Sequence, residues 1–227
     1  MERWSRHRRY GWPGRLVHLC LALLAFQGAT AWAAPGRPLI WAYGDSLTAG
    51  YGLPPDRGFT AQLQAALRKQ GVAAAVRNGG VAGDTAAQGW ARLRWGLRGL
   101  GARPDLVIVE LGANDMLRGL PVAQARANLD QILTELDRRR IPVLLAGMRA
   151  APNLGPAYVR TFESMYPALA KAHRVPLYPF FLDGVAGNRA LVQRDGLHPN
   201  ARGVGVIVRR ILPAVRRALP RGNLPRG

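Results

Sequence analysis

Residues 39–52 read LIWAYGDSLTAGYG, an apolar run that stops at Gly44 and continues as Asp45-Ser46 and a glycine-flanked turn. The run begins at Pro38. It is typical of a buried parallel strand, because such strands are covered on both faces and read as unbroken apolar segments. The hydroxyl of Ser46 would then lie just beyond the carboxyl end of a strand. Taken alone, these residues fit either an ordinary turn or a nucleophile presented at the edge of a sheet.

Strands and helices alternate along the rest of the chain. Apolar runs predict strands at 38–44, 72–78, 104–112, 141–148 and 175–180. Helical spacing of apolar residues predicts helices at 59–71, 85–101, 122–140, 157–173 and 199–219. This order predicts a three-layer α/β fold in which a mostly parallel five-stranded sheet is doubly wound between helices. Ligands of such sheets bind beyond the carboxyl ends of the strands.

The N-terminus differs from the rest of the 227-residue chain. Arginines before Leu16 precede an apolar segment at 16–26 and the small-residue pattern Ala31-Trp32-Ala33, which is the order of a secretory signal peptide. We expect residues 1–33 to be cleaved after Ala33 and the protein to be periplasmic or secreted. A retained anchor is the alternative, although the apolar segment is shorter than the roughly 20 residues that span a bilayer. One domain is predicted at 34–219, followed by a flexible basic tail at 220–227.

The chain is strongly basic, with a formal net charge of +19. Such charge is typical of proteins that bind nucleic acid or an anionic membrane surface. The arginines are scattered and are not interleaved with aromatic residues, so we expect no nucleic-acid partner. After Asp195 there is no acidic residue while arginines accumulate, which makes the last helix a candidate contact for anionic lipid. We expect a monomer.

Few residues are available as metal ligands. The one cysteine, Cys20, lies inside the segment that we expect to be removed, so the mature chain would have no thiol nucleophile and no cysteine ligand. Only His173 and His198 remain as histidines, and two separated histidines make a poor ligand set. We therefore expect neither a metal nor another cofactor.

Small and polar residues follow the predicted strands and precede the last helix, at 44–46, 78–84, 112–115, 148–149 and 195–199. A hydroxyl nucleophile needs a base, a carboxylate that orients the base, and donors for the oxyanion. A turn over 195–198 can bring Asp195 to Nδ1 of His198 and leave Nε2 facing a serine. Alone, the same turn is equally typical of a helix cap, and GDS lacks the G-x-S-x-G pattern of a nucleophile elbow.

The four segments GDSLTAGYG, NGGVAGDT, ELGAND and DGLHPN occur in this order and resemble the signature blocks of the SGNH hydrolases, the GDSL esterase family. The likeness covers nearly all of residues 37–219, and the spacing is similar to the family's periplasmic branch of thioesterases, lysophospholipases and arylesterases. The resemblance implies a flavodoxin-like fold. It also implies a serine hydrolase that cleaves small acyl esters or thioesters through an acyl-enzyme.

The resemblance also implies roles for individual residues. Ser46 is expected to be the nucleophile, His198 the general base and Asp195 its orienting carboxylate. The backbone N–H groups of Ser46 and Gly83 and the side-chain amide of Asn114 are expected to form the oxyanion hole. The less regular loops at 115–121 and 148–158 are expected to line the acyl groove. Their candidate substrate-binding residues are Leu117, Met148 and Pro152.

Two other functions remain open. A carbohydrate-ester deacetylase would use the same triad with a polar binding surface. A basic binding protein without catalysis would share only the fold. The sequence leaves Glu110 unexplained, because a carboxyl group near the end of the most apolar strand needs a partner.

Overall fold

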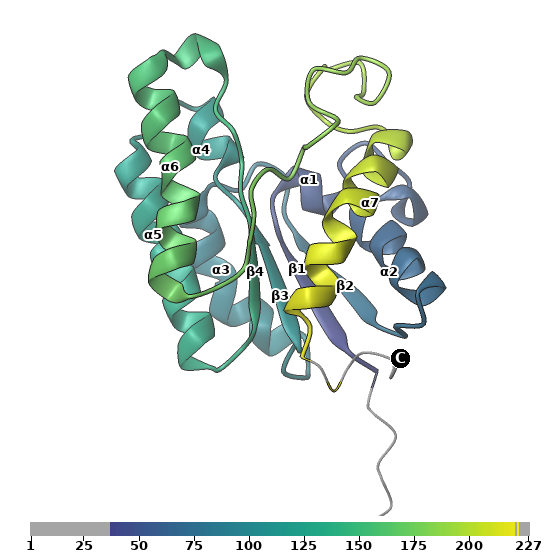
Figure 1. Cartoon of the computed structure of the whole chain (residues 1–227). Coiled ribbons are helices and arrows are strands. Elements are labelled where there is room, and N and C mark those ends of the chain that lie inside the picture. The colour runs from purple at the N-terminus through teal and green to yellow at the C-terminus, as the bar shows by residue number, and fades with distance from the viewer. Residues whose placement is uncertain (1–36, 221, 223–227) are drawn as a thin grey trace, which may run out of the picture. The chain divides into compact units, whose positions relative to one another are not determined.

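The apolar run that ends at Gly44 forms the first strand of the protein, β1 (Leu39–Gly44). The computed structural model describes residues 37–220 and 222 (Figure 1). The predicted signal peptide, its cleavage after Ala33 and most of the predicted tail at 220–227 lie outside the described residues.

Five parallel strands form one sheet in the order β2-β1-β3-β4-β5. The remaining strands are β2 (Ala75–Gly80), β3 (Leu106–Glu110), β4 (Val143–Ala146) and β5 (Leu177–Tyr178). This is the flavodoxin-like order, in which the chain reverses direction across the sheet between β1 and β3. The predicted fold class is confirmed, and all strand pairs are parallel.

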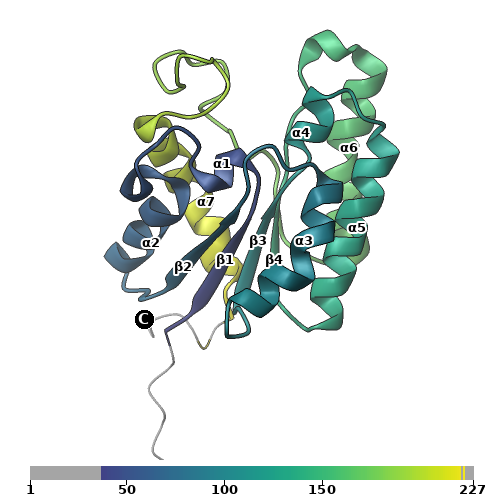
Figure 2. The same cartoon turned by 180° about the vertical axis from the view of Figure 1, so that it is seen from behind.

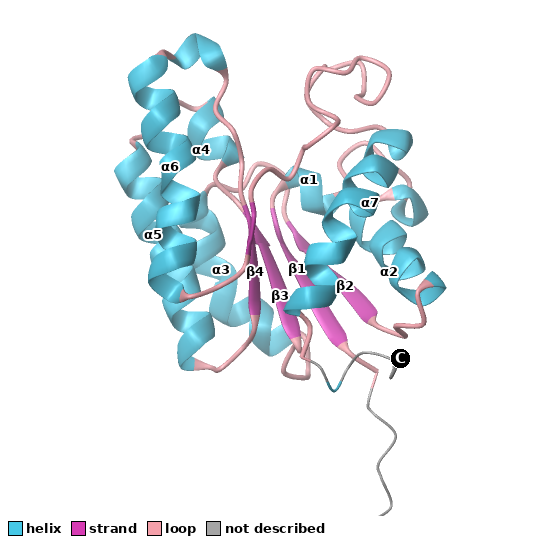
Figure 3. Cartoon of the chain, in the orientation of Figure 1, coloured by secondary structure: helices cyan, strands magenta, loops and turns pink. Residues whose placement is uncertain are grey.

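Helices cover both faces of the sheet (Figures 1 and 2). On one face α2 packs against α7, and on the other α5 packs between α3 and α6. The bounds are α2 Phe59–Lys69, α3 Ala86–Gly99, α5 Val122–Arg138, α6 Pro156–His173 and α7 Ala201–Ala218. Figure 3 shows the resulting arrangement of a strand layer between two helix layers. Among the described helices, none is both long and apolar enough to cross a bilayer.

The sheet core explains why the third strand has the most apolar sequence. Every residue of β3 is buried, because helices cover the strand on both sides. Its last residue, Glu110, pairs in register with Gly44 of β1. The most apolar strand therefore places a buried carboxyl group beside the residue that precedes Asp45-Ser46.

The second strand lies later in the chain than its predicted position at 72–78. It continues through Gly79 and Gly80, which read as turn residues in the sequence. A Cβ at Gly79 would collide with the Trp41 indole, and one at Gly80 would collide with the backbone of Ala49. Glycine stands here because neighbouring groups approach the strand closely, rather than because the chain turns.

The fifth strand is shorter than the predicted 175–180. Pro176 and Pro179 flank its two residues, and proline has no N–H to donate to a neighbouring strand. Several short helical segments were not predicted from the sequence. They are α1 (Ser46–Ala49), α4 (Ala113–Leu117) and the 3-10 turns η1 (Pro55–Arg57) and η2 (Pro152–Leu154). Both α1 and α4 begin directly after strands, at the sheet edge where ligands are expected.

Candidate active site

The start of α1 presents Ser46 beyond the end of β1. Asp45 caps this helix, because its Oδ1 accepts a hydrogen bond from the Leu47 N–H at 3.0 Å. Gly44 has to be glycine, since a Cβ there would collide with the Thr48 hydroxyl and with Glu110. The strand therefore ends in a tight turn that places the Ser46 hydroxyl at the carboxyl edge of the sheet.

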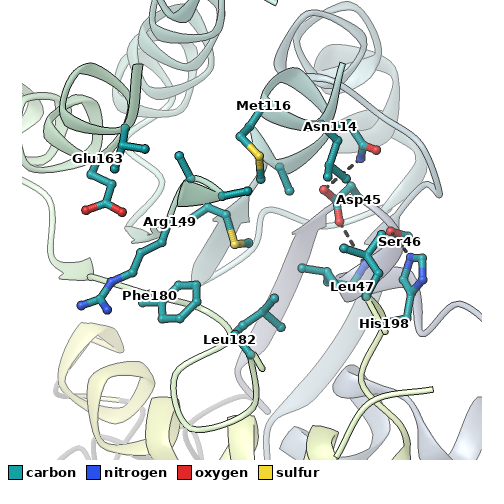
Figure 4. Close-up of a pocket in the computed structure, with 18 of the residues that line it drawn as sticks. Asp45, Ser46, Leu47, Asn114, Met116, Arg149, Glu163, Phe180, Leu182 and His198 are labelled. Atoms are coloured by element: carbon teal, nitrogen blue, oxygen red, sulfur yellow. Dashed lines mark hydrogen bonds between the residues drawn. The ribbon is translucent and has the colours of Figure 1, made fainter. Parts of the chain in front are cut away.

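His198 joins this serine to a carboxylate. Its Nε2 lies 2.9 Å from the Ser46 Oγ (Figure 4). Its Nδ1 lies 2.7 Å from Asp195 Oδ2. Asp195 Oδ1 accepts further hydrogen bonds from the backbone N–H groups of Leu197 and His198, at 2.9 and 3.0 Å. Hydrogen bonding to His198, the largest effect, and to these two N–H groups lowers the Asp195 pKa to about 2. This carboxyl is therefore charged throughout the neutral range.

The loop that carries Asp195 and His198 is held from both sides. The Gln193 N–H donates to the His198 carbonyl at 2.7 Å, and the Gln193 side-chain amide donates to the Tyr51 carbonyl, also at 2.7 Å. The Tyr51 ring lies against the imidazole, with a centroid separation of 4.6 Å. Asn200 caps the following helix by accepting from the backbone of its first turn. The imidazole is therefore fixed toward Ser46 by groups from two separate segments.

Gly83 and Asn114 reach the same place from two other strand ends. Gly83 has φ +86°, a conformation that favours glycine, and it follows β2. The Asn114 Nδ2 donates to Asp45 Oδ2 at 3.1 Å and to the Asp84 carbonyl at 3.0 Å. Among the hydrogen bonds of the described residues, none uses the backbone N–H of Ser46 or Gly83 as donor. Two N–H groups are thus available beside the serine, whereas the amide of Asn114 already has two acceptors.

A cavity of about 930 Å³ opens from these residues along the sheet edge. Leu117, Met148 and Pro152, which the sequence indicated as groove residues, all line it. Its remaining wall is mainly apolar and comes from α4, from the segment after β4, from the start of α6 and from residues 180–186. Sequence reasoning did not identify Phe180 and Leu182 as lining residues, because it assigned 175–180 to a strand. The sequence did contain a signal for this part of the wall, because the apolar residues continue past Pro179 as Phe180, Phe181 and Leu182.

Charge is confined to the two ends of the cavity. Asp45 and His198 lie at one end, and Arg149 and Glu163 lie at the other (Figure 4). The Arg149 guanidinium stands over the Phe180 ring, 5.2 Å from its centroid. The mouth is apolar as well, since it exposes Tyr51 (54%), Leu117 (50%) and Leu197 (43%). The part of the cavity between the two polar ends is therefore suited to an uncharged, apolar part of a ligand.

His173 is not part of this site. Its Nε2 lies 2.7 Å from Asp130 Oδ1, which joins the end of α6 to α5. Within the described residues, no cluster of three or more His, Cys, Asp or Glu side chains is placed to hold a metal ion. The arrangement at Ser46 offers a nucleophile, a base and hydrogen-bond donors, which are the parts that acyl transfer requires.

Several known proteins are similar to this chain in sequence and in structure. The profile of the GDSL-like Lipase/Acylhydrolase family matches residues 42–206. Esterase TesA of Pseudomonas aeruginosa is 40% identical over 184 residues, covering 81% of this chain and 88% of the relative. Thioesterase 1/protease 1/lysophospholipase L1 of Escherichia coli K12 is 37% identical, covering 82% and 84%. The crystal structure of AlinE4, an SGNH-hydrolase family esterase, matches with a TM-score of 0.69 and 50% identity, covering 81% of this chain and 97% of that one.

Proposed function

The chain belongs to the GDSL-like lipase/acylhydrolase family and is a carboxylic ester hydrolase, and we propose that it works through Ser46, His198 and Asp195 on acyl esters and thioesters. The observation that carries the proposal is the continuous hydrogen-bonded chain from the Ser46 Oγ through the imidazole to the Asp195 carboxylate. Ser46 and His198 line one end of a cavity whose wall is mainly apolar.

In the first half of the reaction, His198 Nε2 takes the proton of Ser46 as Oγ attacks the carbonyl carbon of the substrate. Asp195, which stays charged because its pKa is about 2, holds Nδ1–H toward itself and stabilises the imidazolium. The imidazolium then protonates the leaving alcohol or thiol as the carbon–oxygen or carbon–sulfur bond breaks. An acyl group remains on Ser46.

In the second half, water replaces the leaving group. His198 takes a proton from the water, hydroxide equivalent adds to the acyl carbon, and the proton returns to Ser46 Oγ as the carboxylic acid leaves. Neither half needs a metal or a cofactor. In both halves the negative oxygen is stabilised by the N–H groups of Ser46 and Gly83 and by the Asn114 amide, which exchanges the Asp84 carbonyl for this oxygen while it keeps its hydrogen bond to Asp45.

Replacing Asn114 by alanine is expected to lower kcat on the order of 10²–10³-fold, as removal of one oxyanion donor does in other acyl-transfer enzymes. KM should change little, because the donor acts on charge that develops in the transition state. Steady-state kinetics on a p-nitrophenyl ester measures both. A fall in kcat of tenfold or less would remove Asn114 from the oxyanion hole.

The apolar wall favours acyl chains over carbohydrate esters. We propose that Leu117, Met148 and Pro152 contact the acyl chain, since each lines the cavity that begins at Ser46. The related esterase and lysophospholipase are consistent with such substrates. A carbohydrate-ester deacetylase would need polar groups along this wall, and polar side chains occur only at its ends.

Hydrolysis of p-nitrophenyl acetate, octanoate and palmitate tests this substrate class, with the Ser46→Ala variant as the blank. We expect kcat/KM to rise from acetate to octanoate, because each buried methylene contributes about 0.8 kcal/mol of binding. Turnover confined to acetate would instead favour a short-chain or carbohydrate-ester deacetylase. Absence of turnover above the blank would favour a binding protein without catalysis.

Three finer properties belong to the same proposal. The order of residues 1–33 supports export and a periplasmic or secreted location, and the intact mass of the exported protein tests cleavage after Ala33. The exposed arginines of α7, among them Arg209 and Arg217, support contact with anionic lipid. Co-sedimentation with vesicles of anionic lipid tests that contact, and equal binding by an Arg209→Gln/Arg217→Gln variant would contradict it. We propose a monomer, which sedimentation equilibrium tests.

A further inference from the structure

Glu110 is a fully buried carboxyl group that the proposed reaction does not use. It ends β3 with no exposed surface. Its Oε2 accepts a hydrogen bond from the Thr48 hydroxyl at 2.8 Å. Its Oε1 is also buried, and no donor among the described residues reaches it. A proton on that oxygen would turn it into a donor and so give it a partner that an ionised carboxylate lacks.

The acceptor for such a proton is the carboxyl group of Asp45. Asp45 is also fully buried. It lies between Gly44, on which a Cβ would collide with Glu110 Oε2, and Thr48, whose hydroxyl donates to the same oxygen. Two carboxyl groups can share a hydrogen bond only when one of them is protonated. Asp45 accepts from the Leu47 N–H at 3.0 Å and from the Asn114 amide at 3.1 Å, whereas the Glu110 Oε1 has no hydrogen-bond partner among the described residues. A negative charge is therefore better stabilised by hydrogen bonds on Asp45 than on Glu110, which favours the proton on Glu110.

The charged and titratable groups around the two carboxyl groups are each engaged with other partners. Arg92, from α3, pairs with Asp84 and donates to the Gly44 carbonyl. His198, from the loop before α7, is held by Ser46 and Asp195. The others facing the pair are the Tyr166 hydroxyl of α6, which donates to the Leu111 carbonyl, and Asp115 of α4, which accepts from the Ala86 N–H.

The electrostatics of the pair agree with this geometry. Burial raises the Glu110 pKa well above its usual range, and the neighbouring charge of Asp45 raises it further. Burial also raises the Asp45 pKa, to about 6. Since the charge of Asp45 disfavours a charge on Glu110, one proton on the pair is favoured over two buried negative charges.

We propose that Glu110 is a positioning residue that donates its proton to Asp45 and so holds the Asp45 carboxylate between the start of α1 and the Asn114 amide. Asp45 thereby fixes the helix that carries Ser46 and the amide that is proposed to bind the oxyanion (Figure 4). The proton has a second effect. It removes one of two buried negative charges that would oppose the negative oxygen of the transition state. This inference rests on the proposed roles of Ser46 and Asn114.

Glu110→Gln and Glu110→Leu separate this role from simple packing. The glutamine amide donates to Asp45 and its oxygen accepts from Thr48, so we expect kcat at pH 7 to stay within about threefold of wild type. The leucine variant fills a similar volume without a donor, and we expect kcat to fall about 10–100-fold with KM little changed. Equal losses in both variants, or wild-type kcat in both, would overturn the proposal.

The pH dependence of Tm and of kcat distinguishes the proposed proton from a packing role, because packing alone would not change with pH. Because the Glu110 pKa is raised in the folded protein above its ordinary value of 4.5, the folded state loses stability as pH rises from that value toward the folded pKa. The Tm of wild type should therefore decline with rising pH through this window, and the Tm of Glu110→Gln should decline less. In the same way, kcat should fall at alkaline pH in wild type and fall less in Glu110→Gln. Identical profiles would overturn the shared proton.

Infrared spectroscopy tests the proton without relying on catalysis. We expect the carbonyl band of a protonated carboxylic acid in wild type at pH 7, absent from folded Glu110→Gln. A wild-type spectrum without this band would overturn the proposal even if the leucine variant failed to fold. Activity retained in Ser46→Ala would instead contradict the proposed function and leave the infrared result intact, so the two failures are distinguishable.

Discussion

Replacing Ser46 by alanine is expected to lower kcat on the order of 10⁶-fold, the scale that loss of the nucleophile reaches in serine hydrolases. No other hydroxyl lies within hydrogen-bond distance of the His198 Nε2 among the described residues. The base would then have no nucleophile to activate, and only the oxyanion donors and the binding cavity would remain. Steady-state hydrolysis of p-nitrophenyl octanoate measures the loss.

The fold should survive this change. Ser46 is partly exposed, and the hydrogen bond of its hydroxyl is the one to His198. Alanine is also compatible with the first position of a helix. An unchanged Tm and circular dichroism spectrum would show that the loss is chemical. Hydrolysis within about tenfold of wild type would remove Ser46 from the reaction.

Replacing Asp195 by asparagine should lower kcat on the order of 10⁴-fold, as loss of the orienting carboxylate does elsewhere. The asparagine amide can donate to Nδ1 of His198, which favours the tautomer with a proton on Nε2. That tautomer cannot accept the serine proton. The change also removes the negative charge that stabilises the imidazolium.

The matched control for this variant is Asp183→Asn. Asp183 is an exposed carboxyl that pairs with Arg210 at 2.8 Å and does not line the cavity. We expect its kcat to equal that of wild type. If Asp195→Asn kept wild-type kcat at neutral pH, Asp195 would not orient the base.

Much of the fold could be predicted from the pattern of apolar residues, which form continuous runs in the strands and recur at helical spacing in the helices. The strand that ends at Gly44 and the continuous apolar run of β3 are recognisable because parallel strands are buried on both faces. The exceptions have local causes. Gly79 and Gly80 lie within β2 because the Trp41 indole and the backbone of Ala49 approach them, and no linear pattern reports these neighbours.

The candidate site was predictable to a different extent at each residue. Ser46, Asp195 and His198 stand in short segments that resemble the signature blocks of the family, and this resemblance implied that they meet. The structure brings their side chains into contact. The groove is less visible in the sequence, because its wall combines residues from four separate segments. The link between Glu110 and Asp45 depends on the register of β1 and β3, which only the folded sheet defines.

The most direct test of the account is to react the protein with a p-nitrophenyl alkylphosphonate and to map the modified residue by mass spectrometry of its peptides. Such a reagent forms a stable bond with an activated serine hydroxyl. We expect one adduct per chain, on Ser46, with loss of esterase activity in proportion to labelling and no adduct in Ser46→Ala. Inactivation through another residue, or full activity after Ser46 is labelled, would contradict the central claim that Ser46 is the nucleophile.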